Sequence, residues 1–245
     1  MADCEKINPY EGDGRAKTEQ VRAMFDNIAP AYDFMNRAMT MGIDRLWRRH
    51  AIDSLRPDQP RYILDVATGT GDLAMLMAKR LDPVRIFAVD LSEGMLSLGR
   101  AKVAEAGLGD VITFSQGDCL HLPFTDRMFD VVTVAYGVRN FENLLEGYRE
   151  MHRVTRPGGR LMVIELSTPT SPFIKPLYDI YTRRVIPAVG RLISRDSRAY
   201  TYLPESIAAV PQGDEMADLM RQAGYKDVSV EPLTFGVCTL YIATA

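Results

Sequence analysis

The 245-residue chain has 47% apolar and 25% charged residues, and its 29 basic and 32 acidic side chains give a formal net charge of −3. This composition is typical of a globular protein, and the weak net charge argues against a nucleic-acid-binding surface that covers the whole molecule. Three widely spaced cysteines and three histidines without a metal-ligand spacing predict neither a disulfide framework nor a metal site.

The amino-terminal region is predicted to be a flexible tail followed by a helical lid. Residues 1–17 are polar, show no signal-peptide pattern, and are expected to form the tail. Apolar side chains at helical spacing begin near Thr18, and Pro30 is predicted to end or bend that helix. A second helix is predicted over 46–55, so residues 18–57 form the lid. No apolar run approaches the roughly 18 residues of a membrane span, and we expect a cytoplasmic protein.

From residue 62 onward, strand-like apolar runs alternate with helical segments. The runs are 62–66, 85–89, 111–115, 130–134 and 160–165, and the helices between them are 72–81, 93–106 and 143–155. Strict alternation predicts an open, mostly parallel sheet with helices on both faces. Residues 168–204 break the rhythm and are expected to form an insertion. A helix over 214–223 and two strands, 227–230 and 237–242, complete a seven-stranded α/β fold in one domain, 18–245.

A glycine-rich loop follows the first strand, where a ligand of a parallel sheet binds. The loop contributes Asp65, Ala67, Gly69, Thr70 and Gly71 as candidate ligand contacts. Its glycines allow the backbone to approach a ligand closely, because they lack a Cβ.

Acidic residues also end the next two strands. Asp90, followed by Leu91, is placed to accept hydrogen bonds from both hydroxyls of an adenosine ribose. Asp118, followed by Cys119, either accepts from the adenine amine or caps a turn.

The loop favours S-adenosylmethionine (SAM) over a dinucleotide. Its sequence, Gly69-Thr70-Gly71-Asp72, lacks the third glycine of a pyrophosphate-binding turn. A carboxylate at Asp72 is expected to repel a pyrophosphate at the helix start, whereas a sulfonium tolerates it. An NAD-dependent oxidoreductase remains the alternative from another enzyme class.

From about Val21 to Ala243 the chain resembles the menaquinone and ubiquinone C-methyltransferase family, whose members have the Rossmann-like fold of class I SAM-dependent methyltransferases. The matching segments are Tyr32-Asp33-Phe34-Met35-Asn36, Gly42 to Arg48, Gly137-Val138-Arg139-Asn140, Arg153 to Gly159 with Glu165-Leu166-Ser167, and Tyr200 to Ile207. Departures occur at Thr40 and Asp44, where the family often has Ser and His. Ala67-Thr68 replaces a common Ala-Gly pair, and Ala135 replaces a common Ser, so a hydroxyl contact to SAM is lost there.

The resemblance implies a quinol substrate with a polyprenyl tail, most closely demethylmenaquinol, that gains a methyl group on a ring carbon. A benzoquinol substrate, another small-molecule substrate and a SAM-binding protein without activity remain alternatives. The resemblance also allows a homodimer, and no nucleic-acid partner is expected.

Arg139 and Tyr32 are the expected catalytic residues. The Arg139 guanidinium would stabilise negative charge on a ring oxygen, unless it only pairs with a carboxylate. The Tyr32 hydroxyl would hold the substrate or a water, unless the ring only packs. Asn36, Asn140, Tyr178 and Tyr202 are expected to contact the substrate. Glu165 either orients a water or pairs with an arginine.

A basic and apolar stretch in the insertion is a candidate contact with an anionic membrane surface. It contains Arg183, Arg184, Arg191, Arg195 and Arg198 among Ile186, Val189, Leu192 and Ile193. The stretch either rests on the membrane or forms a covering helix with solvated arginines.

Overall fold

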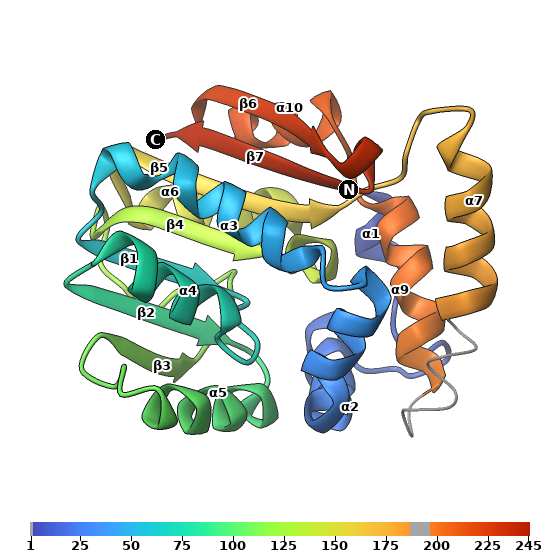
Figure 1. Ribbon diagram of the computed structural model, residues 1–245, viewed down its shortest axis with the longest axis horizontal. Coiled ribbons are helices and arrows are strands. Elements are labelled where there is room, and N and C mark those ends of the chain that lie inside the picture. The colour runs from blue at the N-terminus through green and yellow to red at the C-terminus, as the bar shows by residue number, and fades with distance from the viewer. Residues whose placement is uncertain (1, 187–196) are drawn as a thin grey trace.

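The strands form one mixed sheet in the computed structural model, which describes residues 2–186 and 197–245 (Figure 1). Within these residues the strand order is β3-β2-β1-β4-β5-β7-β6. The strands are β1 (Tyr62–Val66), β2 (Arg85–Asp90), β3 (Ile112–Gln116), β4 (Phe129–Ala135), β5 (Thr155–Leu166), β6 (Lys226–Leu233) and β7 (Cys238–Thr244). Strands β1 to β5 pair in parallel, whereas β7 is antiparallel to both β5 and β6. The predicted seven-stranded α/β fold is therefore confirmed.

Helices cover both faces of the sheet, as the alternation predicts. One face is covered by α3 (Asp44–Ser54), α4 (Asp72–Leu81) and α5 (Glu93–Glu105), and the other by α6 (Leu144–Val154) and α10 (Asp214–Gln222) (Figure 1). Ile52 and Met77 pack in the first core, and Tyr148 and Met220 in the second, all fully buried. This burial of large side chains on both faces is the main stabilising contribution to the domain.

A third group of helices lies beyond the carboxyl ends of the parallel strands (Figure 1). It consists of α2 (Lys17–Thr40), α7 (Ile174–Ile180), the π-helical turn η3 (Tyr181–Val185) and α9 (Ser197–Ala209). The predicted insertion thus contains α7, η3 and most of α9, while 187–196 lie outside the described residues. This group closes over the edge of the sheet where a ligand of the fold binds.

Helix α2 continues through Pro30, so the expected helix end at that residue is wrong. A proline inside a helix loses one backbone hydrogen bond. The apolar side of α2 packs through Met24 and Ile28 against Met95 of α5. This packing compensates for the lost bond, so the helix continues through Pro30 although a proline by itself favours a helix end.

The first residues also differ from the loose tail that their composition suggests. They include the short helix α1 (Asp3–Lys6), and the side chain of Cys4 is fully buried in the core. The Lys17 ammonium donates to the Cys4 carbonyl and is itself buried. A single buried cysteine in a polar segment has no periodicity, so no pattern reveals its packing.

Candidate functional site

A cleft opens where β1, β2, β3 and β4 end, and we call it the strand-end cleft. Its lining includes the predicted residues Tyr32, Ala67, Gly69, Asp90, Leu91, Asp118, Cys119, Ala135 and Asn140. The neighbouring part of the cleft, on the other side of Ala67 and Gly69, is lined by Asp65 and Thr70. Parallel strands bring these residues together because their carboxyl ends meet at one edge of the sheet.

Asp90 ends β2 with both carboxylate oxygens bonded to the backbone. The Gly69 amide donates to Oδ2 at 2.7 Å, and the Ser92 amide donates to Oδ1 at 2.9 Å. Burial raises the pKa of Asp90, although these two amides counteract the shift. Each carboxylate oxygen accepts a second hydrogen bond readily, so a diol in the cleft finds two acceptors.

The glycine-rich loop approaches neighbouring segments closely. Gly71 has a φ of +78° at the start of α4, and a Cβ there would lie 2.7 Å from the Phe114 ring. Thr70 is buried and donates its hydroxyl to Asp33 of α2 at 2.6 Å. Gly71 therefore packs against Phe114 and is not among the residues that line the cleft in the described part of the chain, whereas Gly69 lines it and the Thr70 hydroxyl bonds to the lid.

Asp65 lies at the bottom of the cleft with 1% of its surface exposed. The hydroxyls of Thr133 and Thr68 donate to its two oxygens, each at 2.6 Å. Burial raises the pKa of this carboxyl to about 6 despite those bonds. A positively charged ligand above it would favour the ionised form.

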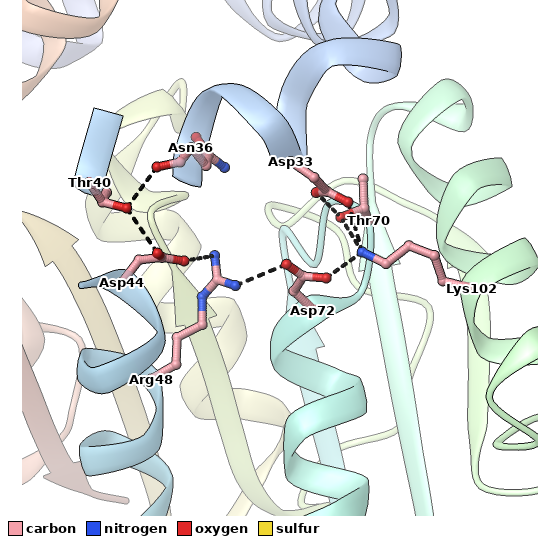
Figure 2. Close-up of polar contacts among 8 residues, drawn as sticks. All are labelled: Asp33, Asn36, Thr40, Asp44, Arg48, Thr70, Asp72 and Lys102. Atoms are coloured by element: carbon pink, nitrogen blue, oxygen red, sulfur yellow. Dashed lines mark hydrogen bonds and ion pairs between the residues drawn. The ribbon is translucent and has the colours of Figure 1, made fainter. Parts of the chain in front are cut away.

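Two cations pair with the carboxylate of Asp72, so the expectation that it repels a pyrophosphate is wrong. It is bonded by the Lys102 ammonium and lies 3.2 Å from the Arg48 guanidinium (Figure 2). Burial alone would raise the pKa of Asp72, but these two cations hold it below its usual range. Its charge is therefore balanced inside the protein.

Asp118 caps a turn and lines the cleft at the same time. Its Oδ1 accepts from the Leu120 amide at 2.9 Å, which is the structural role that the sequence left open. The neighbouring Cys119 is buried and lines the same wall. Asn140, in the 3₁₀ turn η2 (Val138–Asn140), lies across the cleft, and its buried Oδ1 has no partner within the described part of the chain.

A second space, which we call the apolar cavity, adjoins the strand-end cleft and has a volume of about 300 Å³. Its polar lining consists of Tyr32, Asn36, Thr40, Asp44, Trp47, Arg48, Tyr136, Arg139, Tyr178, Tyr181, Thr182 and Thr234. Apolar side chains from α2, α7 and α9 complete the wall. Tyr32 and Tyr136 line both spaces, so the two meet at these rings.

Arg139 is buried beside this junction. It forms an ion pair with a carboxylate, which is one of the two roles that the sequence predicts for it. Its NH1 lies 2.7 Å from Glu165 Oε1 and also donates to the Tyr136 carbonyl. Burial by itself would lower the pKa of Arg139, but Glu165 and nearby tyrosines outweigh it, so the guanidinium stays charged. Its Nε is buried without a partner among the described residues.

The remaining predicted contacts divide between two pockets. Asn36 and Tyr178 line the apolar cavity, and burial raises the pKa of Tyr178 to about 12. Tyr202 instead lines a small adjoining pocket shared with Tyr32 and Asn140. Its buried hydroxyl has no partner in the described ranges, so it is available to a ligand.

Sequence reasoning missed a second arginine and its partners. Thr40, Asp44 and Arg48 are spaced by four residues, and Arg48 lies over the Tyr136 ring with its Cζ 5.5 Å from the ring centroid. The spacing is the available signal, because side chains four apart on a helix face each other. Thr40 ends α2 and Asp44 begins α3, so the signal crosses a turn.

Known proteins resemble the chain over nearly its whole length. The ubiE/COQ5 methyltransferase family matches residues 14–245. A demethylmenaquinone methyltransferase of Bacteroides fragilis is 50% identical over 240 residues, covering 98% of both chains. A ubiquinone/menaquinone biosynthesis C-methyltransferase of Geobacter sulfurreducens is 45% identical, covering 98% of this chain and 93% of the relative.

Solved structures share the fold at low identity. A SAM-dependent methyltransferase of Thermotoga maritima superposes with a TM-score of 0.62 and 19% identity, covering 91% of this chain and 98% of the other. The extent of the family match and the identity to its named relatives settle the assignment. The chain belongs to the ubiE/COQ5 methyltransferase family.

Proposed function

We propose that this protein transfers the methyl group of SAM to a ring carbon of a polyprenylated quinol, with demethylmenaquinol as its substrate. The observation that carries the proposal is the junction at Tyr32 and Tyr136, where the cleft that contains the Asp90 carboxylate meets a large apolar cavity. The printed activities of relatives at 45% and 50% identity support a quinol in menaquinone or ubiquinone biosynthesis.

The strand-end cleft fits SAM by the chemistry of its donors and acceptors. Asp90 would accept from the ribose hydroxyls, and Asp118, Cys119 and Leu91 would surround the adenine. Asp65 and the backbone at Ala67, Gly69, Thr70 and Ala135 would bind the charged methionine end. When bound, SAM supplies an electrophilic methyl group on a positively charged sulfur.

The apolar cavity would hold the quinol ring against that methyl group. A phenol-type ring carbon becomes a good nucleophile when the neighbouring hydroxyl loses its proton. Arg139 stays charged, and its Nε has no partner among the residues that the structure describes, so it would stabilise the resulting oxyanion. Tyr32, Asn36, Asn140, Tyr178 and Tyr202 would hold the ring in line with the methyl group, which supplies much of the acceleration.

The mouth of the cavity supports contact with a membrane surface, from which a polyprenyl tail has to be collected. Met41 and Leu177 line the cavity and are also exposed, so it opens between them. Phe173 and Ile180 extend this exposed apolar side along α7. No helix in the described ranges is long and apolar enough to cross a bilayer, so contact would be peripheral.

The basic stretch expected at the membrane is only partly described. Arg191, Arg195, Val189, Leu192 and Ile193 lie outside the described residues. Arg184 is exposed at the end of η3, beyond α7. The proposed membrane contact therefore rests on the apolar side of α7.

Methyl transfer from radiolabelled SAM to a reduced demethylmenaquinone analogue in detergent tests the proposal, with a demethylated benzoquinol assayed in parallel. We expect label in the naphthoquinol. Label in both quinols would extend the substrate range to ubiquinone precursors. No label in either, with SAM binding confirmed by calorimetry, would overturn the proposed substrate class and leave the proposed cofactor standing.

The same assay in anionic vesicles tests the membrane contact. Phe173→Gln should lower turnover in vesicles while leaving turnover in detergent unchanged, because Phe173 is 83% exposed and does not line the cavity. Val84→Gln is the matched control, since Val84 is exposed at the opposite, amino-terminal end of β2. Equal turnover of the Phe173 variant and the parent protein in vesicles would contradict the contact.

A further inference from the structure

Asp44 is the only carboxylate among the described residues that line the apolar cavity. It is the first residue of α3, and its side chain is 4% exposed. The other charged groups on the same wall are Arg48 and Arg139, and Arg139 is already paired with Glu165. A buried carboxylate is costly unless it is paired and hydrogen-bonded, and Asp44 has Thr40 and Arg48 as partners.

The side chain of Thr40 connects Asp44 to helix α2. Thr40 Oγ1 lies 2.7 Å from the Asn36 carbonyl oxygen and 2.9 Å from Asp44 Oδ1 (Figure 2). A threonine hydroxyl has a single hydrogen, so it donates to one of these two acceptors at a time. The Asn36 carbonyl also accepts the Thr40 backbone N–H within α2, so the hydroxyl can donate to Asp44 while Asp44 is ionised.

The Thr40 hydroxyl can bond to Asp44 in either charge state. It donates to the ionised carboxylate, and it accepts from a protonated Asp44 while it donates to the Asn36 carbonyl. Both arrangements use the same pairs of atoms. The local geometry thus suits a carboxylate that takes up a proton and returns it.

Arg48 allows Asp44 to change its charge without leaving an unpaired cation. Its NH2 lies 3.5 Å from Asp44 Oδ2, and its NH1 lies 3.2 Å from Asp72 Oδ2 (Figure 2). The contact with Asp44 is longer than the 2.7–2.9 Å typical of a strong charge-assisted bond. When Asp44 is neutral, Arg48 keeps Asp72 as its counter-charge.

We propose that Asp44 is the proton acceptor for the quinol hydroxyl in the apolar cavity, an inference that rests on the proposed function. The hydroxyl proton passes to a carboxylate oxygen of Asp44, and the electron pair left on oxygen shifts into the ring. The neighbouring ring carbon bonds to the methyl carbon as the methyl–sulfur bond breaks, and that electron pair stays on sulfur. The ring carbon then loses its hydrogen to water as a proton, and Asp44 returns its proton to the ring oxygen.

The groups that influence the charge of Asp44 come from several elements. They are Arg48 on the same helix, Asp72 on α4, Tyr136 after β4, and Tyr32, Arg139, Tyr178 and Tyr181 on the cavity wall. Two of these groups, Arg48 and Arg139, are cations, and Arg48 lies between Asp44 and Asp72.

Three variants test the proposal in the labelled-methyl assay. Asp44→Asn should lower kcat by about 100-fold or more, the usual contribution of a general base, and should leave the Kd for SAM unchanged. Asp44→His should restore part of kcat and move the acid limb of the pH–rate profile upward, since a free imidazole titrates about 2.6 pH units above an aspartate. Asp53→Asn, on the same helix and paired with Arg80, is the matched control and should not change kcat.

The outcomes separate this proposal from the one on which it rests. Absence of turnover in the parent protein would overturn the proposed function, and the role of Asp44 with it. Turnover by the parent and by Asp44→Asn at similar kcat, or a rise in KM alone, would overturn the role of Asp44 only. Should Asp44→Asn lose SAM affinity through misfolding, Asp44→His decides: an unmoved acid limb contradicts the proposal.

Discussion

The two halves of the site are built in different ways. The strand-end cleft is formed by short loops after β1 to β4, so a single sheet sets the positions of Asp90, Ala67 and Ala135. The apolar cavity is lined mainly by side chains of α2, α3, α7, η3 and α9, with Tyr136, Arg139 and Leu166 contributed from the strand ends. Thr40 and Thr234 on its wall are far apart in the sequence. The first half follows from topology, whereas the second depends on how the covering helices pack.

The halves also differ in how their polar groups are satisfied. Asp90 and Asp65 in the cleft accept hydrogen bonds from the protein at both oxygens. Beside the cavity, the Nε atoms of Arg48 and Arg139 are buried without partners among the described residues, as are the Tyr136 hydroxyl at the junction and Asn140 Oδ1 in the cleft. Such groups cost free energy until a ligand bonds to them. The two carboxylates of the cleft are therefore held in place by the protein, whereas both arginines beside the cavity keep a donor for a ligand.

The largest expected effect comes from removing the Asp90 carboxylate from the strand-end cleft. Asp90→Ala should weaken SAM binding by roughly 100- to 10,000-fold, because two hydrogen bonds to a charged acceptor contribute about 1.5–3 kcal/mol each. Titration calorimetry with SAM measures the affinity. Arg139→Ala, in the other half, should slow methyl transfer and leave SAM affinity unchanged.

These two variants test whether the cleft and the cavity have separate roles. A threefold or smaller change in SAM affinity for Asp90→Ala would remove the carboxylate from the cofactor site. Loss of SAM affinity in Arg139→Ala would show that the halves are not independent. Unfolding by urea is the necessary control for the arginine variant, because it leaves Glu165 buried and unpaired at a cost of about 3–5 kcal/mol.

The sequence predicts the cleft well because local rules act there. Apolar runs bounded by glycine and proline locate β1 to β4 within about two residues, and Asp90 ends β2 as expected. The role of Asp72 could not be predicted, since its partner Lys102 lies on another helix, 30 residues later. An ion pair between residues on two different helices produces no recognisable spacing in the sequence.

The sequence predicts the cavity less well. Tyr32, Arg139 and Tyr178 were identified by resemblance, and the structure brings them to one wall. The departures at positions 40 and 44 lie next to each other, with Thr40 donating to Asp44. Each departure alone carries no chemistry, and only the turn between α2 and α3 shows that they belong together.

The next expected effect is a change in how stability depends on pH. The folded-state pKa of Asp65 is about 6, above the usual value of 3.8. The folded chain therefore binds the extra proton more readily, and this contribution to stability is full below about pH 4 and lost above about pH 6. Asp65→Asn removes the titration and keeps partners for Thr68 and Thr133. Relative to the parent, it should gain about 2 kcal/mol in unfolding free energy between pH 4.5 and 7.5.

Urea unfolding at the two pH values measures this difference, in the absence of SAM. A difference that does not change with pH would mean that the carboxyl titrates alike in the folded and unfolded chains. The same variant should bind SAM more weakly, because a positive ligand loses its nearest counter-charge. If Asp65→Asn is more stable but binds SAM more weakly, the ionised Asp65 carboxylate destabilises the folded protein in the absence of the cofactor.

The smallest expected effect concerns the contact that joins the lid to the glycine-rich loop. Lys102 of α5 bonds to Asp33 of α2, to Thr70 of the glycine-rich loop and to Asp72 of α4 (Figure 2). Lys102→Met keeps most of the side chain and removes the charge. Asp72 still has Arg48, so the loss should be about 1 kcal/mol, the upper range for partly exposed ion pairs.

Salt distinguishes this contact from packing. The Lys102→Met effect on urea unfolding should shrink between about 0.05 and 0.5 M NaCl, because ions screen partly exposed charges. Lys79→Met, an exposed lysine on α4, is the matched control and should have almost no effect in either buffer. If Lys102→Met lost more than about 3 kcal/mol of unfolding free energy at both salt concentrations, the ion pairs of Lys102 would behave as buried pairs, whose disruption strongly destabilises a protein. The lid would then be a fixed part of the cofactor site.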